Sequence, residues 1–527
     1  MNSATSQTPD DRPAAAPLRE LAAQYGLEFL PEPPAEILDP ALVARLPVDW
    51  ARAHALLPVR LAGEPCALTA DPRQVAELEY LGMLLGLELR PVLAPRDRIL
   101  RAIEQCYYRK DDTPTSFLQT LAEPRPANAP ASARSDDLLQ SAEQAPVTQL
   151  VNLILLEAVK RRASDIHFEP FEDRLRVRYR VDGVLYEQAA PPKHLEQALI
   201  SRLKVMARMD IAEKRLPQDG TARVRVGERE IDIRVSTLPV AEGERVVLRL
   251  LDRDSALLPL TVLGMPDDVL AAFSALLAEP NGLIVVSGPT GSGKTTTLYA
   301  ALSRLDAARR NILTIEDPIE YQLPNIGQMQ VKPKIGLTFA NGLRHILRQD
   351  PDVILVGETR DAETAEIAIR AALTGHLVFT TLHTNDAPGG VLRLVDMGLE
   401  PYLLAACVRA ILAQRLARRL CPRCRRPARV TQDDLRAYGP AFAPLRGESV
   451  WQAGGCPECL EGYRGRVGLF ELLIVDREIQ TLIRAGSAGV EALRASAEAR
   501  GMRSLLADAL AKVREGTTSL AEVANIV

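Results

Sequence analysis

Residues 282–296 read Gly-Leu-Ile-Val-Val-Ser-Gly-Pro-Thr-Gly-Ser-Gly-Lys-Thr-Thr, and this stretch indicates the fold of the largest part of the chain. Its second half, 288–295, matches the phosphate-binding pattern G-x-x-x-x-G-K-[ST]. The apolar run from Leu283 to Val286 predicts a buried strand, and the residues from Thr296 onward predict the start of a helix. Strand, glycine loop and helix in this order form the structure that cradles the phosphates of a nucleotide.

Each position of this loop has a chemical reason. Glycine can adopt backbone angles that a Cβ forbids, which lets successive N–H groups point at one phosphate. Lys294 reaches the β- and γ-phosphates, and the Thr295 hydroxyl is a ligand for Mg²⁺. A glycine-rich turn beside a lysine is the alternative, which the flanking strand and helix disfavour. The residues expected to hold the nucleotide are Gly288, Pro289, Thr290, Gly291, Ser292, Gly293, Lys294, Thr295 and Thr296.

The composition excludes several classes of protein. A chain of 527 residues exceeds one hydrophobic core, so three or four domains are expected. The net charge of −4 implies no general attraction to nucleic acid, and 4% aromatic residues leave little material for stacking on bases. No apolar run approaches the roughly 18 residues of a membrane span, and the N-terminus lacks the features of a signal peptide. We therefore expect a cytoplasmic protein.

Shifts in composition and periodicity divide the rest of the chain. An amphipathic helix followed by alternating strands and hairpin turns predicts a small α+β domain in the middle. Strands that alternate with helices after it indicate an α/β core with a parallel sheet and crossover helices. We expect a disordered tail at 1–17, an N-terminal α/β domain at 18–110, a Pro/Ala/Ser-rich mobile linker at 111–145, the α+β domain at 146–252 and the α/β core at 263–527.

The apolar strand at 353–356 ends in Gly357-Glu358. An apolar strand that ends in an acid is a weak pattern alone and a strong one in a chain that has a phosphate loop. Such a carboxylate polarises the attacking water or holds the Mg²⁺ shell during phosphoryl transfer. Glu358 is therefore the candidate hydrolytic residue.

Two further strands, expected at 311–315 and 377–382, carry ionisable residues at their ends. Three supporting carboxylates follow the first strand: Glu316, Asp317 and Glu320. A helix or turn cap explains one or two of them equally well. His376 and His383 flank the second strand. Two roles are open for them: contact with the γ-phosphate, or a purely structural role.

The chain also carries two C-x₂-C knuckles, Cys421-Pro-Arg-Cys424 and Cys456-Pro-Glu-Cys459. Paired knuckles in a cytoplasmic chain predict one tetrahedral Zn²⁺ site. The gap at 425–455 exceeds the usual length, so it predicts a small insert within a zinc unit at about 415–465. A redox pair is disfavoured because no thioredoxin-like context surrounds either knuckle.

The segment 415–429 is rich in arginine, and a zinc unit with such a cluster can bind nucleic acid, so this alternative stays open. The remaining cysteines, Cys66, Cys106 and Cys407, are expected to be buried.

These motifs in this order resemble the secretion ATPase superfamily, specifically its type II secretion and type IV pilus-assembly branch. The resemblance covers about 145–527, and the N-terminal domain is more similar to the type II secretion branch. Thr359 stands where the family often has an aliphatic residue. The matching stretches are 163–170 (Ala-Ser-Asp-Ile-His-Phe-Glu-Pro), 180–185, 215–220, 288–295, 314–320, 347–352, 374–383 and 462–471.

The resemblance implies a RecA-like core in a ring, usually a hexamer, with ATP and Mg²⁺ between the core and the preceding domain. On matching positions, Arg234 and Arg249 of that preceding domain close over the phosphates. It also implies a motor that drives pseudopilus assembly, and so type II protein export, through an inner-membrane platform protein. The alternatives are a type IV pilus-assembly ATPase, a nucleic-acid motor and a nucleotide-binding scaffold without hydrolysis, which Glu358 disfavours.

The N-terminal domain, 18–110, shows no catalytic constellation, and the linker sets it apart from the motor. We therefore expect it to dock onto the cytoplasmic part of an inner-membrane secretion protein and to hold the motor peripherally at that membrane. A regulatory or solubilising domain is the alternative. No nucleic-acid partner is expected.

Overall fold

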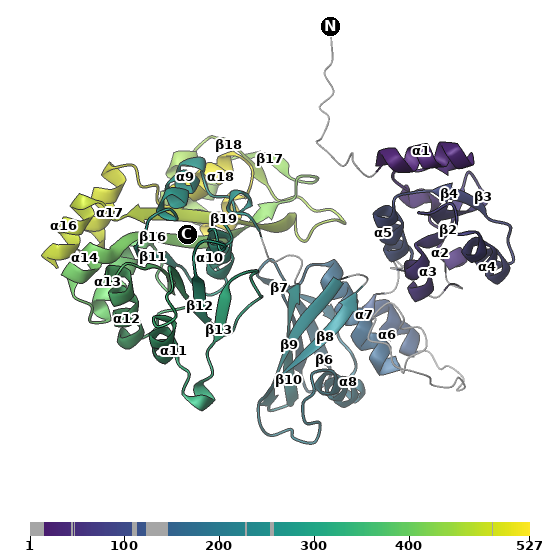
Figure 1. Ribbon diagram of the computed structural model, residues 1–527, viewed down its shortest axis with the longest axis horizontal. Coiled ribbons are helices and arrows are strands. Elements are labelled where there is room, and N and C mark those ends of the chain that lie inside the picture. Colours follow the sequence, from purple (N-terminus) through teal and green to yellow (C-terminus); the bar gives the residue numbers. More distant parts are fainter. Residues whose placement is uncertain are drawn as a thin grey trace, which may run out of the picture. The chain divides into compact units, whose positions relative to one another are not determined.

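The computed structural model describes residues 15–43, 46, 48–107, 113–122, 146–226, 229–252, 258–486 and 489–526. The chain divides into two compact units, Met1–Asp252 and Arg253–Val527, and each is described by itself (Figure 1). Among the described residues, no helix is both long and apolar enough to cross a bilayer.

A four-stranded sheet forms the centre of the N-terminal domain. Its order is β1-β4-β3-β2, and the β2–β3 hairpin turns at Gly63, whose φ of +87° favours glycine. Cys66 and Cys106 are buried in this domain, as expected. The elements are α1 (Ala15–Tyr25), β1 (Glu28–Phe29), α2 (Pro40–Val43), α3 (Val48–His54), β2 (Leu56–Leu61), β3 (Glu64–Thr69), α4 (Val75–Leu85), β4 (Arg90–Leu93) and α5 (Arg96–Tyr107).

The expected linker at 111–145 is wrong in its first part, because helix α6 (Pro114–Ala122) lies there. Pro114 stands at the first helical position, where its missing N–H is no loss. The Thr113 side chain accepts the N–H of Ser116 at 3.1 Å, which caps the helix start. Thr115 Oγ1 donates to the carbonyl of Gln188 at 2.9 Å and ties α6 to the following domain. The remainder of the expected linker, 123–145, and most of the expected tail lie outside the described residues.

A six-stranded antiparallel sheet of order β7-β6-β5-β10-β9-β8 follows. Along β6, Leu175, Val177, Tyr179 and Val181 are buried, as the alternation predicts, and Tyr179 Oη donates to Ile154 O of helix α7 at 2.7 Å. The other face carries polar side chains. The elements are α7 (Pro146–Lys160), β5 (Asp165–Pro170), β6 (Leu175–Val181), β7 (Val184–Ala189), α8 (Lys193–Met206), β8 (Gln218–Val226), β9 (Arg229–Val240) and β10 (Gly243–Asp252).

The second unit is built on a seven-stranded sheet of order β13-β12-β14-β15-β11-β16-β19, parallel except for β19. Its central strand β11 is buried on both faces, because Leu283 and Val285 enter one core and Ile284 and Val286 enter the other. The strands are β11 (Gly282–Ser287), β12 (Ile312–Glu316), β13 (Gly327–Gln330), β14 (Val353–Val356), β15 (Leu377–Leu382), β16 (Val408–Leu420) and β19 (Tyr463–Ile474).

Helices cover both faces of this sheet. Buried side chains of α9 and α10 pack in one core, and those of α11 to α14 pack in the other together with the C-terminal helices. The helices are α9 (Asp267–Leu276), α10 (Lys294–Leu302), α11 (Phe339–Ile346), α12 (Ala362–Leu373), α13 (Ala387–Asp396), α14 (Pro401–Cys407), α16 (Arg477–Ala485), α17 (Val490–Ala499), α18 (Leu505–Arg514) and α19 (Leu520–Ala524).

Two expected boundaries shift. The second unit begins at Arg253 rather than 263, and Leu260 is already buried in its core. The zinc unit is shorter than 415–465, since β16 continues to Leu420 and β19 starts at Tyr463. The insert between these strands holds a two-stranded sheet of β17 (Arg426–Arg429) and β18 (Ser449–Gln452), and helix α15 (Gln432–Tyr438).

Candidate nucleotide site and metal centre

The loop 288–293 lies between β11 and α10, and its glycines have the backbone that the motif needs. Gly288, Gly291 and Gly293 have φ values of +146°, +81° and +88°. A Cβ on Gly288 would lie 2.3 Å from the carbonyl oxygen of Gln414, and one on Gly293 would lie 2.9 Å from its Nε2. Gln414 of β16, buried below the loop, also accepts the hydroxyl of Thr297 at 2.7 Å. The two loop glycines are thus required by packing as well as by conformation.

The polar groups of the loop fit a phosphate. Lys294 Nζ donates to the carbonyls of Gly288 and Pro289 at 2.7 and 3.0 Å, and burial lowers the pKa of Lys294 to about 8. The Ser292 hydroxyl is buried without a partner among the described residues, whereas Thr295 is exposed and accessible to a metal ion. A buried cation and an unpaired hydroxyl both gain from a bound anion.

Strands β15 and β14 bring two further groups to the same edge. Gly288 N donates to Leu382 O at 3.3 Å, so the start of the phosphate loop lies beside the C-terminal end of β15. The Glu358 carboxylate, beyond β14, lies 3.8 Å from His383 Nε2 and 2.7 Å from Arg360 Nη2. Burial, and next the charge of Lys294, lower the pKa of His383, which favours the neutral imidazole. We name residues 288–295 with Glu358 and His383 the nucleotide edge.

The first supporting carboxylate, Glu316, lies inside the protein at the end of β12. It accepts hydrogen bonds from Tyr299 Oη, from Thr314 Oγ1 at 2.6 Å and from Gln328 Nε2 at 3.1 Å. These partners join helix α10 to β12 and β13, so Glu316 braces the helix that carries Lys294. Asp317 is exposed and Glu320 half-buried directly after it.

The two histidines lie at opposite ends of β15. His376 precedes the strand, and its carbonyl accepts the N–H of Gly282, the first residue of β11. Its Nδ1 lies 2.8 Å from the carbonyl oxygen of Ala371. Seven residue steps at about 3.3 Å each separate it from His383 by about 23 Å. Within one chain, therefore, only His383 belongs to the nucleotide edge.

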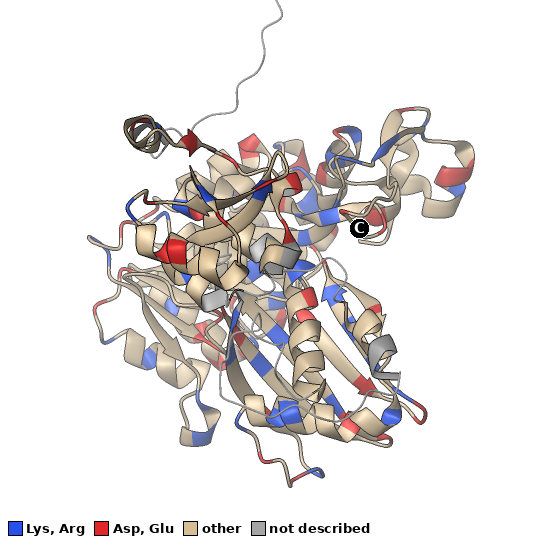
Figure 2. Ribbon diagram, turned by 90° about the vertical axis from the view of Figure 1, so that its right-hand side faces the viewer, with Lys and Arg blue, Asp and Glu red and all other residues tan. Residues whose placement is uncertain are grey.

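In the first unit, register aligns the expected arginines in one row across the six-stranded sheet. Arg234 of β9 pairs with Arg249 of β10, which pairs with Asp165 of β5, which pairs with Arg180 of β6. Arg249 Nε lies 3.0 Å from Asp165 Oδ1, and the Arg249 side chain is 59% exposed. Charges of both signs are interspersed along the ribbon (Figure 2). This row holds three arginines against one aspartate, which suits an anion.

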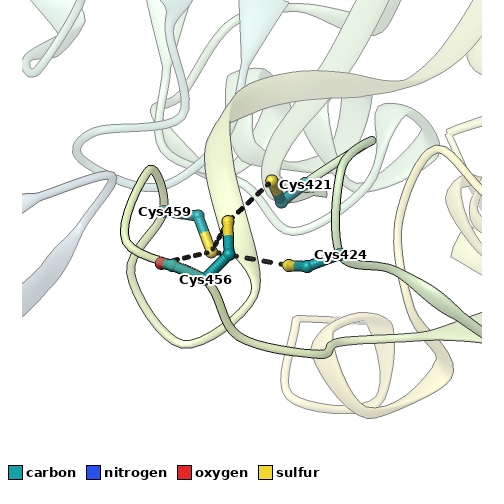
Figure 3. Close-up of side chains that lie close together, drawn as sticks. All are labelled: Cys421, Cys424, Cys456 and Cys459. Carbon is teal, nitrogen blue, oxygen red and sulfur yellow. Dashed lines mark hydrogen bonds between the residues drawn. The ribbon is translucent and has the colours of Figure 1, made fainter.

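The four knuckle cysteines converge in the insert (Figure 3). All four Sγ atoms lie within 4.8 Å of one another, with Cys421–Cys456 at 3.9 Å, Cys424–Cys459 at 3.6 Å and Cys456–Cys459 at 3.5 Å. A tetrahedral zinc with Zn–S bonds of about 2.3 Å separates its sulfurs by about 3.8 Å. The thiols therefore fit one Zn²⁺, and we name them the metal centre.

Sequence reasoning missed three residues of the site. Tyr299 is fully buried and faces Glu316, Gln328 reaches Glu316 from β13, and Gln414 supports the phosphate loop from β16. None belongs to a chemical motif. For Gln414 no local signal exists, because its neighbours in space, from Gly288 to Thr297, come from 117 to 126 residues earlier in the chain.

Comparisons with known proteins agree with this architecture. The Type II secretion system protein E of Klebsiella pneumoniae is 50% identical over 459 residues, which are 84% of this chain and 88% of that protein. That of Dickeya dadantii is 46% identical and covers 92% of this chain and 98% of its own length. The Type IV pilus assembly ATPase PilB of Myxococcus xanthus is 44% identical over 95% of this chain and 89% of its own.

Among solved structures, the ATPase DotB of Legionella pneumophila superposes with a TM-score of 0.52 at 22% identity, over 71% of this chain and 94% of its own. DotB of Yersinia pseudotuberculosis gives 0.53 at 20%, over 76% and 98%. These similarities confirm the expected RecA-like fold. The MshEN domain model matches residues 25–113, and the model described as Type II/IV secretion system protein matches residues 140–525. The chain therefore belongs to the type II/IV secretion system protein family.

Proposed function

We propose that this chain hydrolyses ATP at the nucleotide edge and that the hydrolysis drives pseudopilus assembly and protein export by type II secretion. The observation that carries the proposal is the meeting of Lys294 and Glu358 at one sheet edge, each from a different strand. The charge of Glu358 opposes the lowering of the pKa of the half-buried Lys294, so the two charges lie within electrostatic reach of each other. A cation for the phosphates and a carboxylate for the water are the two charges that hydrolysis needs.

The residues divide the work. Lys294 and backbone groups of 288–293 hold the β- and γ-phosphates, and Glu358 orients the attacking water and accepts its proton. His383 is proposed to donate a hydrogen bond to the γ-phosphate. Thr295 would hold Mg²⁺, which would neutralise charge on the phosphates. Asp317 and Glu320 complete the acidic side of the site.

Arg234 and Arg249 are proposed to close over the phosphates from the first unit. Three observations support this role: the two residues are cross-strand neighbours, they belong to a row with excess positive charge, and the Arg249 side chain is largely exposed. An exposed guanidinium can exchange a carboxylate for a phosphate at little cost, since both are bidentate acceptors. The same proposal includes assembly into a hexameric ring.

The metal centre is proposed to bind Zn²⁺ as a closed structural site. Its insert packs on the C-terminal segment, where Arg425 Nη1 donates to Gly516 O at 2.7 Å and Arg514 Nε donates to Glu448 Oε2 at 2.8 Å. The arginines of this region are therefore partly engaged within the chain. A nucleic-acid motor is the weaker proposal.

The two relatives of the type II system, at 50% and 46% identity, favour type II secretion over type IV pilus assembly. We further propose that the N-terminal domain docks onto the cytoplasmic part of an inner-membrane secretion protein, and that an inner-membrane platform protein receives the motion. This arrangement would keep the motor at the cytoplasmic face of the inner membrane.

A genetic experiment separates the candidates. Deletion of the gene should abolish export of secreted proteins while surface piliation persists, and the wild-type gene should restore export where Glu358→Gln does not. Loss of piliation with intact export would assign the chain to pilus assembly instead. Purified protein should hydrolyse ATP without DNA, and steep stimulation by DNA would favour the nucleic-acid motor.

A further inference from the structure

Glu358 lies beyond the last residue pair of its strand, yet both of its neighbours are tied to β15. The ladder between β14 and β15 ends at Val356 and Thr380. Past that point, Thr381 Oγ1 donates to the carbonyl of Gly357 at 2.7 Å, and the N–H of Thr359 donates to the carbonyl of Thr381 at 3.1 Å. The backbone is therefore held immediately before and immediately after the acid.

A side-chain pair adds a third tie. The Thr359 and Thr380 hydroxyl oxygens lie 2.7 Å apart, and the two residues are 4% and 1% exposed. Successive side chains of β15 point to opposite faces, so Thr380 and Thr381 contact residues 357–359 from opposite faces of the sheet. Because water cannot reach this pair, each hydroxyl depends on the other for its hydrogen bond.

The carboxylate needs such restraint because its neighbours compete for it. Arg360, 71% exposed on its side chain, pairs with Glu358 from the solvent side, while His383 lies 3.8 Å away on the side of the phosphate loop. A small rotation of the backbone at 358 would move the acid away from His383 and leave Arg360 as its only near partner of the two. In catalysis, a misplacement of about 1 Å can cost about a hundredfold in rate.

We propose that Thr359 and Thr380 form a positioning pair that holds the Glu358 carboxylate beside His383 at the nucleotide edge. The inference rests on the proposed role of Glu358 in hydrolysis. Neither hydroxyl touches the reacting atoms, so the pair acts through the backbone of 357–359.

The test is a double-mutant cycle measured on the full chain with Mg²⁺ and ATP. Thr359→Val and Thr380→Val each remove one hydroxyl at constant shape and strand the other. Each should lower kcat about tenfold or more while KM changes less than about twofold. Thr359→Ser keeps the hydroxyl and should restore kcat. The double valine variant should have a higher kcat than either single variant, because no hydroxyl is left unpaired.

Thr518→Val is the matched control in the same unit. Thr518 is fully buried, and its hydroxyl donates to the carbonyl of Arg418 at 2.8 Å, away from the nucleotide edge. It should lower the unfolding temperature like the single variants and leave kcat unchanged below that temperature. Three outcomes would each overturn the positioning pair. They are wild-type turnover in Thr359→Val, an equal loss of kcat in the control, and additive losses of kcat in the double variant. Glu358→Gln runs alongside, and its retention of activity would instead overturn the proposed function.

Discussion

The nucleotide edge and the metal centre belong to the same compact unit but are assembled in different ways. The metal centre takes its four thiols from two short loops at the ends of one strand pair, and nothing else is required of the fold. The nucleotide edge takes its groups from the ends of β11, β14 and β15, and Gln414 supports it from β16. Its side chains remain partly exposed to solvent, since a substrate must enter and leave.

This difference predicts opposite consequences for substitutions. At the nucleotide edge, charged groups are held close together at a cost in solvation, so removing one should damage turnover and leave stability nearly intact. At the metal centre, each thiol completes a closed ligand set, so removing one should damage local stability and leave chemistry nearly intact.

Lys294→Ala should lower turnover at least about a thousandfold, because the phosphate charge loses its main side-chain cation. The unfolding temperature should not fall, since burial already disfavours the charged lysine. Steady-state hydrolysis and a thermal scan measure the two effects. The control is Lys334→Ala, an exposed lysine remote in sequence from the loop, which should match the wild type. A large loss of stability in Lys294→Ala would contradict the claim that substitutions at the nucleotide edge affect turnover rather than stability.

Glu358→Gln should lower kcat about 10²–10⁴-fold, the usual range for loss of a catalytic base, while ATP binding persists. The amide preserves the shape and removes the charge. Fluorescent nucleotide binding and single-turnover hydrolysis separate affinity from chemistry. Glu363→Gln, an exposed acid at the start of α12, serves as the matched control. Parental turnover in Glu358→Gln would show that another group activates the water.

Arg249→Ala should lower kcat at least about a hundredfold with a smaller effect on affinity, as for arginines that stabilise transition-state charge. This variant asks whether the nucleotide edge is completed by a group from outside its own unit. Arg174→Ala, a partly exposed arginine whose partner is Asp173, is the control. If kcat is unchanged, the second unit performs the chemistry alone.

The pH dependence of nucleotide affinity reports on the buried cation. Burial holds the pKa of Lys294 at about 8 in the free protein, and a bound phosphate raises it. Below pH 8 the lysine is charged in both states and affinity is constant. Above pH 8 binding must take up a proton, so affinity for a non-hydrolysable ATP analogue should fall about tenfold per pH unit. Calorimetry at pH 7 and pH 9 tests this, and equal affinities would contradict the lowered pKa.

Cys421→Ser should abolish zinc binding and unfold the insert, yet change turnover least, by less than about threefold well below the unfolding temperature. Structural zinc contributes about 10–16 kcal/mol of apparent binding energy in small peptides. Elemental analysis and proteolysis of the insert provide the readouts. Cys407→Ala removes a buried thiol outside the cluster and should keep the zinc. Wild-type protein without zinc under reducing, chelator-free conditions would contradict the metal assignment.

What the sequence alone determined is what depends on contiguous residues. The phosphate loop is one run of eight residues whose glycines act through their own backbone angles, and the cysteine knuckles act through fixed short spacings. The apolar runs at β11, β14 and β15 predicted an α/β core for the same reason, since burial on both faces leaves a local pattern. Helix α6 was not predicted, because the Pro- and Ala-rich composition of 111–145 as a whole indicates a linker. Its start is nevertheless marked by a local signal, the cap at Thr113 and Pro114.

The tertiary structure alone decided which of these groups meet. Strand order and register put Glu358 two strands away from β11. They also place Arg234 beside Arg249 and bring Thr359 against Thr380. Such pairings join residues that are 15 to 117 positions apart, as for Arg234 with Arg249 and Thr297 with Gln414. They follow from the packing of whole sheets and helices, whose free energy is spread over many weak contacts and leaves no mark on any single stretch of sequence.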